Sequence, residues 1–435
     1  MSNINNNHLF KGEWLDTIPL DWKQSKIKHL FKIKKDISGE LGHEVISITQ
    51  KGAKIKDTES GDGQLSMDYS KYQLVTTGDF LMNHMDLLTG YVDISRFDGV
   101  TSPDYRVFVL SDISSSPNYY LYVFQHCYKS KIFYAYGRGS SQLGRWRFPT
   151  VEFDDFYLPV PSLKEQQLIS KYLDKKLSQI DSLIEKTQRK IELLKEQQTA
   201  TINHYVTKGL DPTVKMKDSG IEWIGEIPEH WSITKLKFKL KKIGSGVTPK
   251  GGSEVYTDEG VMFLRSQNIH FEGLVLEDVV RITPQTHIEM SGSTVQLNDV
   301  LLNITGGSIG RCCVVDLNED FNVNQHVCIL RPTDFITSEF LFYFLRSDIG
   351  QTQVYVNQTG SGREGLNFEN LGNFNLPFCS IDEQLCIGNK IKQIDQNFIS
   401  LINKEIHRIE LLKEYRQSLI STVVTGKVRV TEEVI

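Results

Sequence analysis

The sequence predicts an α/β (α+β) protein in which two globular domains are separated by two long helices, paired as an antiparallel coiled coil with a pseudo-twofold internal repeat. Three observations predict this fold. A segment with two tryptophans stands near the start of each half, a β-rich stretch punctuated by glycine follows it, and a long helical segment closes the half. A duplicated unit of roughly 210–220 residues implies two pseudo-equivalent modules, and therefore a partner with two pseudo-equivalent places to bind.

The tryptophan segment is the clearest repeat. Residues 13–22 read Glu-Trp-Leu-Asp-Thr-Ile-Pro-Leu-Asp-Trp, and residues 222–231 read Glu-Trp-Ile-Gly-Glu-Ile-Pro-Glu-His-Trp. A second repeat, Ile-Glu-Leu-Leu-Lys-Glu, occurs at residues 191–196 and again at residues 409–414. Both repeats lie at matching places, so the two halves share one order of elements.

The bulk composition sets the class of protein. A chain of 435 residues is long enough for two or three domains, and 39% hydrophobic with 24% charged residues is ordinary for a soluble globular protein. The polar amino terminus lacks the regions of a signal peptide, and no apolar run has the length of a membrane span, so we expect a cytoplasmic location. The six cysteines form no CxxC pair and are expected to be buried free thiols. A net charge of −5 argues mildly against a protein that holds nucleic acid alone, because phosphate binding needs clustered cations.

Lysines gather directly after each tryptophan segment. Residues 23–35 hold six lysines and no acid, and residues 235–242 hold five lysines. A lysine run is commonly a solvated face, whereas recurrence at the same place in both halves favours a shared contact, and both interpretations stay open. Residues 235–240 alternate with period two, which predicts a half-buried strand with lysines facing outward.

Further elements follow from composition and periodicity. Residues 105–110 and 327–330 are rich in β-branched and apolar side chains and are expected to be strands. Residues 118–128 and 338–347 are amphipathic and are expected to be short helices. A mixture of helices and strands in each half is therefore favoured over an all-β domain.

The long helices have clear ends. Ser162 with Glu165, and Ser380 with Glu383, form Ser-x-x-Glu capping boxes in which the two side chains satisfy backbone N–H groups at a helix start. Gly209 and Gly426 stop the helices. At 1.5 Å per residue, about 45 residues give a rod of roughly 65–70 Å. Gly388 and the residues in the 170s are weak points at which either helix can break.

Both long segments carry a seven-residue pattern of apolar side chains. Thr187, Gln198, Glu405 and Arg416 interrupt it, so each seam is imperfect. Two imperfect seams of equal length in one chain most simply pair with each other, and two unrelated surface helices are the alternative. The positions expected to pair the helices and dock a partner are Leu177, Ile180, Ile184, Ile191 and Leu194 in the first helix and Phe398, Ile402, Ile409, Leu412 and Leu419 in the second.

These elements divide the chain into five parts. We expect a first globular domain at residues 1–161, a first spacer helix at 162–208, a linker and second globular domain at 209–379, a second spacer helix at 380–426 and a tail at 427–435.

Catalytic motifs are mostly absent from the sequence. There is no phosphate-binding GxxxxGK[ST] loop, and the histidines show neither HExxH nor Cys/His ligand spacing, so we expect no catalytic residues and no metal site. Residues 360–365 match GxGxxG, but no helix follows at once, so a flexible loop is favoured over a dinucleotide site. Residues 375–378, Asn-Leu-Pro-Phe, resemble the Asn-Pro-Pro-Phe tetrad of adenine methyltransferases imperfectly and are better explained as the last strand before the capping box.

Polar side chains on glycine-rich loops are candidates for DNA contact. Arginine, glutamine, asparagine and lysine can donate to base edges, and Trp146 is expected to stack or wedge between bases. Each single residue is also consistent with an ordinary surface role. The candidates are Lys51, Arg138, Gln142, Arg145 and Arg147 in the first half and Lys250, Arg265, Gln267, Asn268, Gln358, Ser361 and Arg363 in the second.

The sequence resembles the specificity subunit of type I restriction–modification enzymes. Residues 207–231, from Thr207-Lys208-Gly209 to the second tryptophan segment, resemble the central linker of that family. Thr248-Pro249, residues 324–326 (Asn-Gln-His) and the Gly-Ser loop before Leu366 resemble its target-recognition domains. The resemblance covers nearly the whole chain. The first half lacks the Thr-Pro loop.

The resemblance implies a non-catalytic subunit. In the family, each of two target-recognition domains reads one half of a bipartite, asymmetric DNA site, and the paired helices set the gap and dock two methyltransferase subunits. Restriction subunits then join, while S-adenosylmethionine, ATP and Mg are expected on the partners and not on this chain. The alternatives are a DNA adenine methyltransferase or nuclease with fused recognition domains, and a purely structural coiled-coil adaptor.

Overall fold

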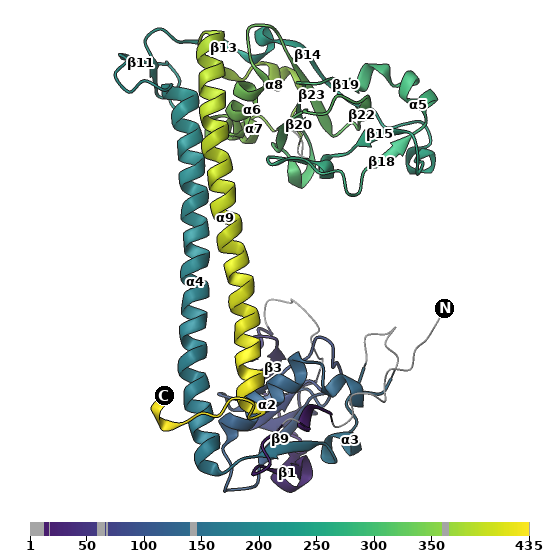
Figure 1. Cartoon of the computed structure of the whole chain (residues 1–435). Coiled ribbons are helices and arrows are strands. Elements are labelled where there is room, and N and C mark those ends of the chain that lie inside the picture. The colour runs from purple at the N-terminus through teal and green to yellow at the C-terminus, as the bar shows by residue number, and fades with distance from the viewer. Residues whose placement is uncertain are drawn as a thin grey trace. The chain divides into compact units, whose positions relative to one another are not determined.

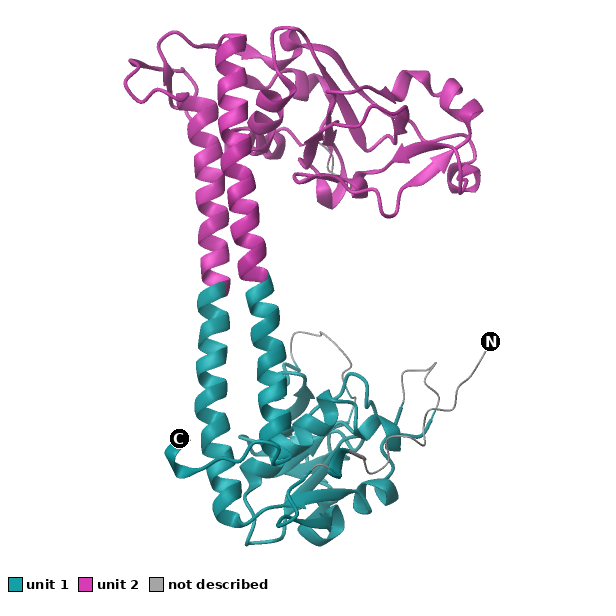
Figure 2. Ribbon diagram, viewed as in Figure 1, with its two compact units in different colours: residues 1–187, 407–435 teal, residues 188–406 magenta. Residues whose placement is uncertain are grey.

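The computed structural model describes residues 13–16, 18–58, 66, 68–139, 146–358 and 365–434. The chain forms two compact units, residues 1–187 with 407–435 (unit 1) and residues 188–406 (unit 2). Figure 2 shows that each unit contains a sheet-rich domain together with one part of each long helix. The fold class predicted from the sequence, with two sheet-rich domains and long helices, is confirmed.

Unit 1 has two four-stranded sheets and a two-stranded one, with strand orders β2-β9-β6-β7, β4-β3-β8-β5 and β1-β10. Its main core joins the first sheet and α2 to the long helices and is rich in aromatic rings such as Phe31, Phe108 and Phe124. The elements are β1 (Lys23–Lys26), α1 (Ile27–Leu30), β2 (Phe31–Lys34), β3 (Val45–Thr49), β4 (Gly52–Ile55), β5 (Gln73–Val75), β6 (Phe80–Met82), β7 (Val92–Ile94), β8 (Gly99–Thr101), β9 (Arg106–Leu110), α2 (Pro117–Lys129), α3 (Thr150–Asp154) and β10 (Tyr157–Val160).

Unit 2 has the strand orders β14-β23-β20-β21, β18-β15-β22-β19 and β13-β24, with two further hairpins, β11-β12 and β16-β17. Its elements, labelled in part in Figure 1, are β11 (Met216–Asp218), β12 (Glu226–Pro228), β13 (Ser232–Lys235), β14 (Leu240–Ser245), β15 (Val261–Leu264), β16 (Ile269–His270), β17 (Gly273–Leu274), β18 (Val280–Ile282), α5 (Pro284–Glu289), β19 (Thr294–Val295), β20 (Val300–Asn303), β21 (Cys312–Val314), β22 (Phe321–Val323), β23 (Val327–Pro332), α6 (Ser338–Arg346), α7 (Asp348–Val356), α8 (Phe368–Gly372) and β24 (Asn375–Phe378).

The two sheet-rich domains repeat one topology. Each pairs its first and last strands antiparallel (β1 with β10, β13 with β24), and each contains one parallel pair, β3 with β8 and β15 with β22. Most of the strands and short helices expected from composition are present. The prediction of one strand at residues 235–240 is wrong in its centre, because residues 236–239 form a 3-10 turn. Before this turn β13 pairs with β24, and after it β14 pairs with β23.

The long helices are α4 (Leu163–Lys208) and α9 (Ile381–Val424). Neither breaks near its start. Gly388 lies inside α9, and a Cβ there would be 3.1 Å from the Cβ of Glu339 on α6, so this glycine allows a close approach between helices. The predicted pairing residues Leu177, Ile180, Ile191, Phe398, Ile402, Ile409 and Leu419 are buried, and Ile184, Leu194 and Leu412 are partly buried.

Three of the four polar residues that interrupt the heptads are paired across the helices, whereas Thr187 donates to the carbonyl of Leu183 in its own helix. In unit 2, Gln198 donates from Nε2 to Oδ1 of Asp395 at 2.6 Å, and Lys190 forms an ion pair with Glu405. In unit 1, the Nε of Arg416 lies 3.1 Å from Oδ1 of Asp181. In unit 2, the earlier residue of α4 (Lys190) pairs with the later residue of α9 (Glu405), and the later residue of α4 (Gln198) pairs with the earlier residue of α9 (Asp395). The two helices therefore run antiparallel there.

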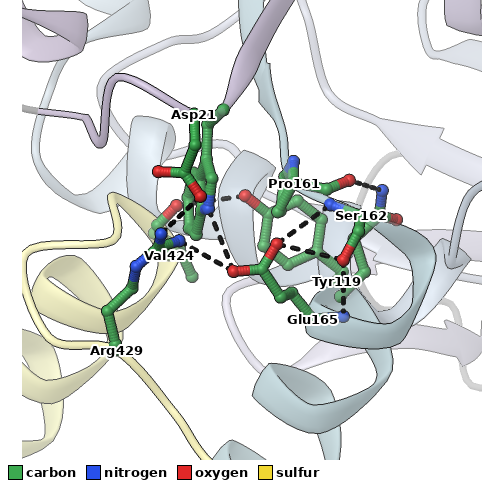
Figure 3. A network of polar contacts seen from close by, with 9 residues as sticks. Asp21, Tyr119, Pro161, Ser162, Glu165, Val424 and Arg429 are labelled. Carbon is green, nitrogen blue, oxygen red and sulfur yellow. Dashed lines mark hydrogen bonds and ion pairs between the residues drawn. The ribbon is translucent and has the colours of Figure 1, made fainter.

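Equivalent junctions tie each long helix to its domain. In unit 1, Glu165 of the capping box accepts from the Trp22 indole at 3.3 Å and pairs with Arg429 (Figure 3). In unit 2, the indole Nε1 of Trp231 donates to Glu383 at 3.0 Å. The repeated tryptophan and the repeated capping box are therefore two parts of one contact.

The glutamine after each capping box completes the junction. Gln166 accepts from the backbone N–H of Ser116 and donates to the carbonyl of Pro161. Gln384 accepts from the N–H of Thr337 and donates to the carbonyl of Cys379 in the same way. Each amide oxygen thus accepts from the backbone N–H of the N-cap residue of a short helix, α2 in unit 1 and α6 in unit 2.

Two smaller expectations concern membranes and cysteines. Among the described residues, no helix is long and apolar enough to cross a bilayer. All six cysteines are free; five are buried, and Cys386 is exposed, contrary to the expectation that all are buried.

Candidate nucleic-acid interface

Polar loops of unit 2 converge at one edge of its sheets. Thr248, in the loop after β14, donates from its hydroxyl to Oε1 of Gln325, which follows β22. Next to it, Nδ1 of His326 lies 2.6 Å from the Thr305 hydroxyl in the loop after β20. A Cβ at Gly246 would lie 1.6 Å from the carbonyl oxygen of Val323, so only glycine permits this approach. We call these loops, with residues 357, 358 and 365, the reading edge of unit 2.

The DNA-contact residues predicted in the second half differ in exposure and in the contacts that they make. Lys250 and Gln267 are exposed, and Gln358 is half-buried. Arg265 donates from Nη2 to the carbonyl of Asp278. Ser361 and Arg363 lie outside the described residues.

Asn268 is a correction among the predicted residues. Its side chain is 1% exposed, its Oδ1 accepts from the N–H of Arg265, and its Nδ2 donates to the carbonyl of Val275. Both ends of the amide are used to hold a 3-10 turn, so Asn268 is structural and is not retained as a DNA contact.

The equivalent reading edge of unit 1 is formed by the segments after β2, β6 and β8 and, among the described residues, by 137–139 and 146–150. Arg138 and Arg147 exchange backbone hydrogen bonds of 2.8 and 3.0 Å, and both side chains are exposed. Arg138 forms an ion pair with Glu152. Gln142 and Arg145 lie outside the described residues.

Two other predicted contacts of unit 1 differ from expectation. Trp146 donates from Nε1 to the carbonyl of Tyr134 at 2.8 Å and packs on that ring, so it supports the domain and does not point out as a wedge. Lys51 is exposed at the tip of the β3–β4 hairpin and lines a separate cavity of about 750 Å³ with Tyr91 and Arg416.

The lysine runs are largely occupied within the domains. Lys26 and Lys28 both pair with Asp155, and Lys34 pairs with Asp79. In unit 2, Lys235 and Lys237 both donate to Asn373. These contacts favour the interpretation of both runs as structural and solvated surface.

Sequence reasoning missed two residues at the reading edge of unit 1. Arg106 begins β9 and is 4% exposed, and burial lowers its pKa to about 10. His84 follows β6, and burial first, then the charges of Arg106 and Arg147, lower its pKa to about 4, so the ring is neutral at pH 7. A lone histidine and one arginine in an apolar strand give no sequence signal; only the pairing of β6 with β9 brings them together.

Within the part of the chain that the structure describes, no group of three or more histidine, cysteine or acidic side chains is placed to hold a metal ion. The reading edges therefore offer hydrogen-bond donors and acceptors on loops, which is the chemistry of base and phosphate recognition.

A family model described as "Type I restriction modification DNA specificity domain" matches residues 19–195 and 282–411, which is well over half of the chain. The chain belongs to this family. The two matched segments each cover sheet strands and part of a long helix, in agreement with the internal repeat. The chain is thus a DNA specificity subunit, and the alternative of a methyltransferase or nuclease with fused recognition domains is not supported.

Similar proteins agree with this assignment. The type I restriction enzyme MjaVIII specificity subunit of Methanocaldococcus jannaschii is 29% identical over 284 residues, which cover 64% of this chain and 63% of that relative. The putative MjaX specificity subunit of the same organism is 26% identical over 97% of both chains. A solved chain from a study of type I R-M complex assembly is similar in fold, with a TM-score of 0.69 and 14% identity over 94% of this chain and 99% of that one. The HsdS subunit from Thermoanaerobacter tengcongensis gives a TM-score of 0.54 and 15% identity over 94% and 98%.

Proposed function

We propose that each sheet-rich domain reads one half of a bipartite, asymmetric double-stranded DNA site. The observation that carries this proposal is the contrast between the two units. Their topology and junction contacts are alike, whereas their reading edges differ: His84, Arg106 and Arg147 in unit 1 stand where unit 2 has Ile304, Cys328 and Gly365. The shared topology and junction contacts suit one kind of partner bound twice, and the different reading edges suit recognition of two different base sequences.

The paired helices, in this proposal, set the gap between the half-sites and dock two methyltransferase subunits, which restriction subunits then join. Both helices contribute to both units, so one pair of helices is tied at each junction to a reading domain. The S-adenosylmethionine, ATP and Mg of such a complex belong to the partners. The modest net charge is consistent with partners that supply much of the phosphate contact.

The reading edges provide the test. We expect Arg147→Ala to relax recognition in one half of the DNA site, and Gln325→Ala to relax it in the other half. The measurement is a map of modified adenines in a host that expresses each variant with its methyltransferase partner. If either substitution changed both halves equally, modular reading would be wrong. Loss of all sequence dependence in the wild-type complex would instead favour the coiled-coil adaptor.

A further inference from the structure

A cavity at the reading edge of unit 1 gathers three arginines. It has a volume of about 360 Å³ and is lined by His84, Arg106, Arg138, Arg147 and neighbouring backbone. A second cavity of about 330 Å³ shares His84 and Arg106 and adds Lys35. Among the described residues, Glu152 forms an ion pair with Arg138, and the charge of Asp154 acts on Arg106 and opposes the lowering of its pKa by burial.

Arg106 is held rigidly but is only partly satisfied. Its Nη2 donates to the carbonyl of Phe148 at 3.0 Å and to the Thr150 hydroxyl at 3.3 Å, and its guanidinium lies 4.3 Å from the centre of the Phe153 ring. Its Nη1 and the Nδ1 of His84 are buried and have no hydrogen-bond partner among the residues that the structure describes. Buried polar atoms are nearly always paired, so both nitrogens call for a further partner.

The same position in unit 2 shows that the fold does not require these groups. The N–H of Phe148 donates to the carbonyl of His84 at 2.8 Å, and the N–H of Leu366 donates to the carbonyl of Ile304 at 2.8 Å, which fixes His84 and Ile304 as equivalents. By strand register Arg106 is equivalent to Cys328, because Met82 pairs with Arg106 as Leu302 pairs with Cys328. In unit 2 this place is an apolar core.

We propose that the cavity around His84 and Arg106 binds one phosphate of the DNA backbone beside the half-site that unit 1 reads. This inference rests on the proposed function and adds a site found in one unit only. A phosphate supplies acceptor oxygens and further negative charge for the three arginines, and arginine binds phosphate in a fixed geometry. Such a contact fixes the position of the domain on the duplex and carries no base preference itself.

The first test measures binding of the full chain to a duplex of random sequence between 50 and 200 mM salt. We expect Arg106→Met to weaken binding roughly tenfold and to reduce the slope of log K against log salt by about 0.9, the value for one phosphate contact. Lys171→Met, which removes the same charge from an exposed position on α4, is the matched control and should leave the slope nearly unchanged. An Arg106→Met slope equal to the Lys171→Met slope would overturn the proposal.

A second arm uses inorganic phosphate alone, because it remains informative if the wild-type chain binds no DNA. Phosphate should raise the midpoint of thermal unfolding of unit 1 above that in chloride of equal ionic strength, in wild type and Lys171→Met but not in Arg106→Met. Hydrogen exchange at α2 checks that the variant is folded; if it is not, Arg138→Met replaces it, because it removes an exposed cation from the same cavity. If phosphate has no such effect and the DNA slopes agree, the two buried nitrogens are met by internal water and the phosphate site does not exist. If the wild-type chain bound no DNA but phosphate still raised the unfolding midpoint of unit 1, the result would count against the proposed function alone.

Discussion

The cluster of Arg346, Asp395 and Gln198 gives the sharpest prediction about stability. Asp395 on α9 accepts from Nη1 of Arg346 on α6 at 2.6 Å and from Nε2 of Gln198 on α4 at 2.6 Å. The Arg346 and Asp395 side chains are only 10% and 7% exposed. This cluster therefore joins both long helices to the domain of unit 2 in a largely buried place.

Removing the carboxylate should be expensive. Asp395→Leu leaves the Arg346 guanidinium buried without its counter-charge, and breaking a buried pair in this way costs about 3–5 kcal/mol of the free energy of unfolding. The matched control is Arg416→Leu in unit 1, which breaks the pair with Asp181. That pair is 29% and 56% exposed, so its loss should cost about 0.2–1 kcal/mol.

A double variant separates the ion pair from other effects. Asp395→Leu with Arg346→Met replaces both charges by apolar side chains of similar size, and such replacements are often neutral or stabilising. We expect the double variant to recover most of the loss, apart from about 1 kcal/mol for the Gln198 amide left without its acceptor.

The assay must report on each unit separately, because a chain with two units need not unfold in one step. Native-state hydrogen exchange of peptides from α6 and from residues 381–406 of α9 gives the free energy of opening in unit 2, and peptides from α2 give that of unit 1. The reasoning is refuted if Asp395→Leu costs no more than Arg416→Leu, or if the double variant is as unstable as the single one.

Two further predictions concern unit 1 and its junction. Gly426 and Gly209 both have φ of +72°, but a Cβ at Gly426 would lie 2.5 Å from Pro19 while the nearest atom at Gly209 is 3.2 Å away at the end of a flexible side chain. We expect Gly426→Ala to cost about 2–4 kcal/mol and Gly209→Ala about 1 kcal/mol, measured as denaturant unfolding of the affected unit; equal losses would contradict the packing argument. Burial first, and then Lys427, lower the pKa of His126 to about 4, so the unfolded chain binds the proton first as pH falls. Unit 1 should lose about 3 kcal/mol between pH 6.5 and 4 from this group, and His126→Gln should remove that part of the pH dependence; an unchanged pH profile would show that the ring is not buried neutral.

Much of the fold could be predicted from the sequence because its strongest signals are local or periodic. A capping box, a helix-stopping glycine and a heptad are each read from residues near one another. The apparent flaws in the heptads could not be explained in this way. Gln198 reads as a break in the seam, and its partner Asp395 lies 197 positions away, so its role appears only when the two helices are paired.

The candidate site was less predictable than the fold, for a related reason. Side chains on glycine-rich loops are visible in the sequence, but whether each one is free for DNA depends on contacts made elsewhere. Asn268 and Trp146 turned inward, while Arg147 and Lys250 remain exposed. His84 and Arg106 gave no signal at all, because their buried nitrogens become unusual only through the register of β6 and β9.

The comparison of the two units separates what positions the domain from what reads. The junction is constrained in both, because a glutamate that caps a long helix must also receive the indole N–H of a tryptophan from the domain, at 3.3 Å in one unit and 3.0 Å in the other. A change in either partner would shift the start of the helix against its sheet. The reading edge is not constrained by such a contact with a long helix. It lies at the ends of strands whose pairing is already fixed. One unit can therefore carry a buried arginine and histidine where the other carries cysteine and isoleucine, and the frame remains the same. Substitutions at the edges should for this reason alter which DNA is bound while leaving the folding of each unit intact, whereas substitutions at Glu165 or Glu383 should do the reverse.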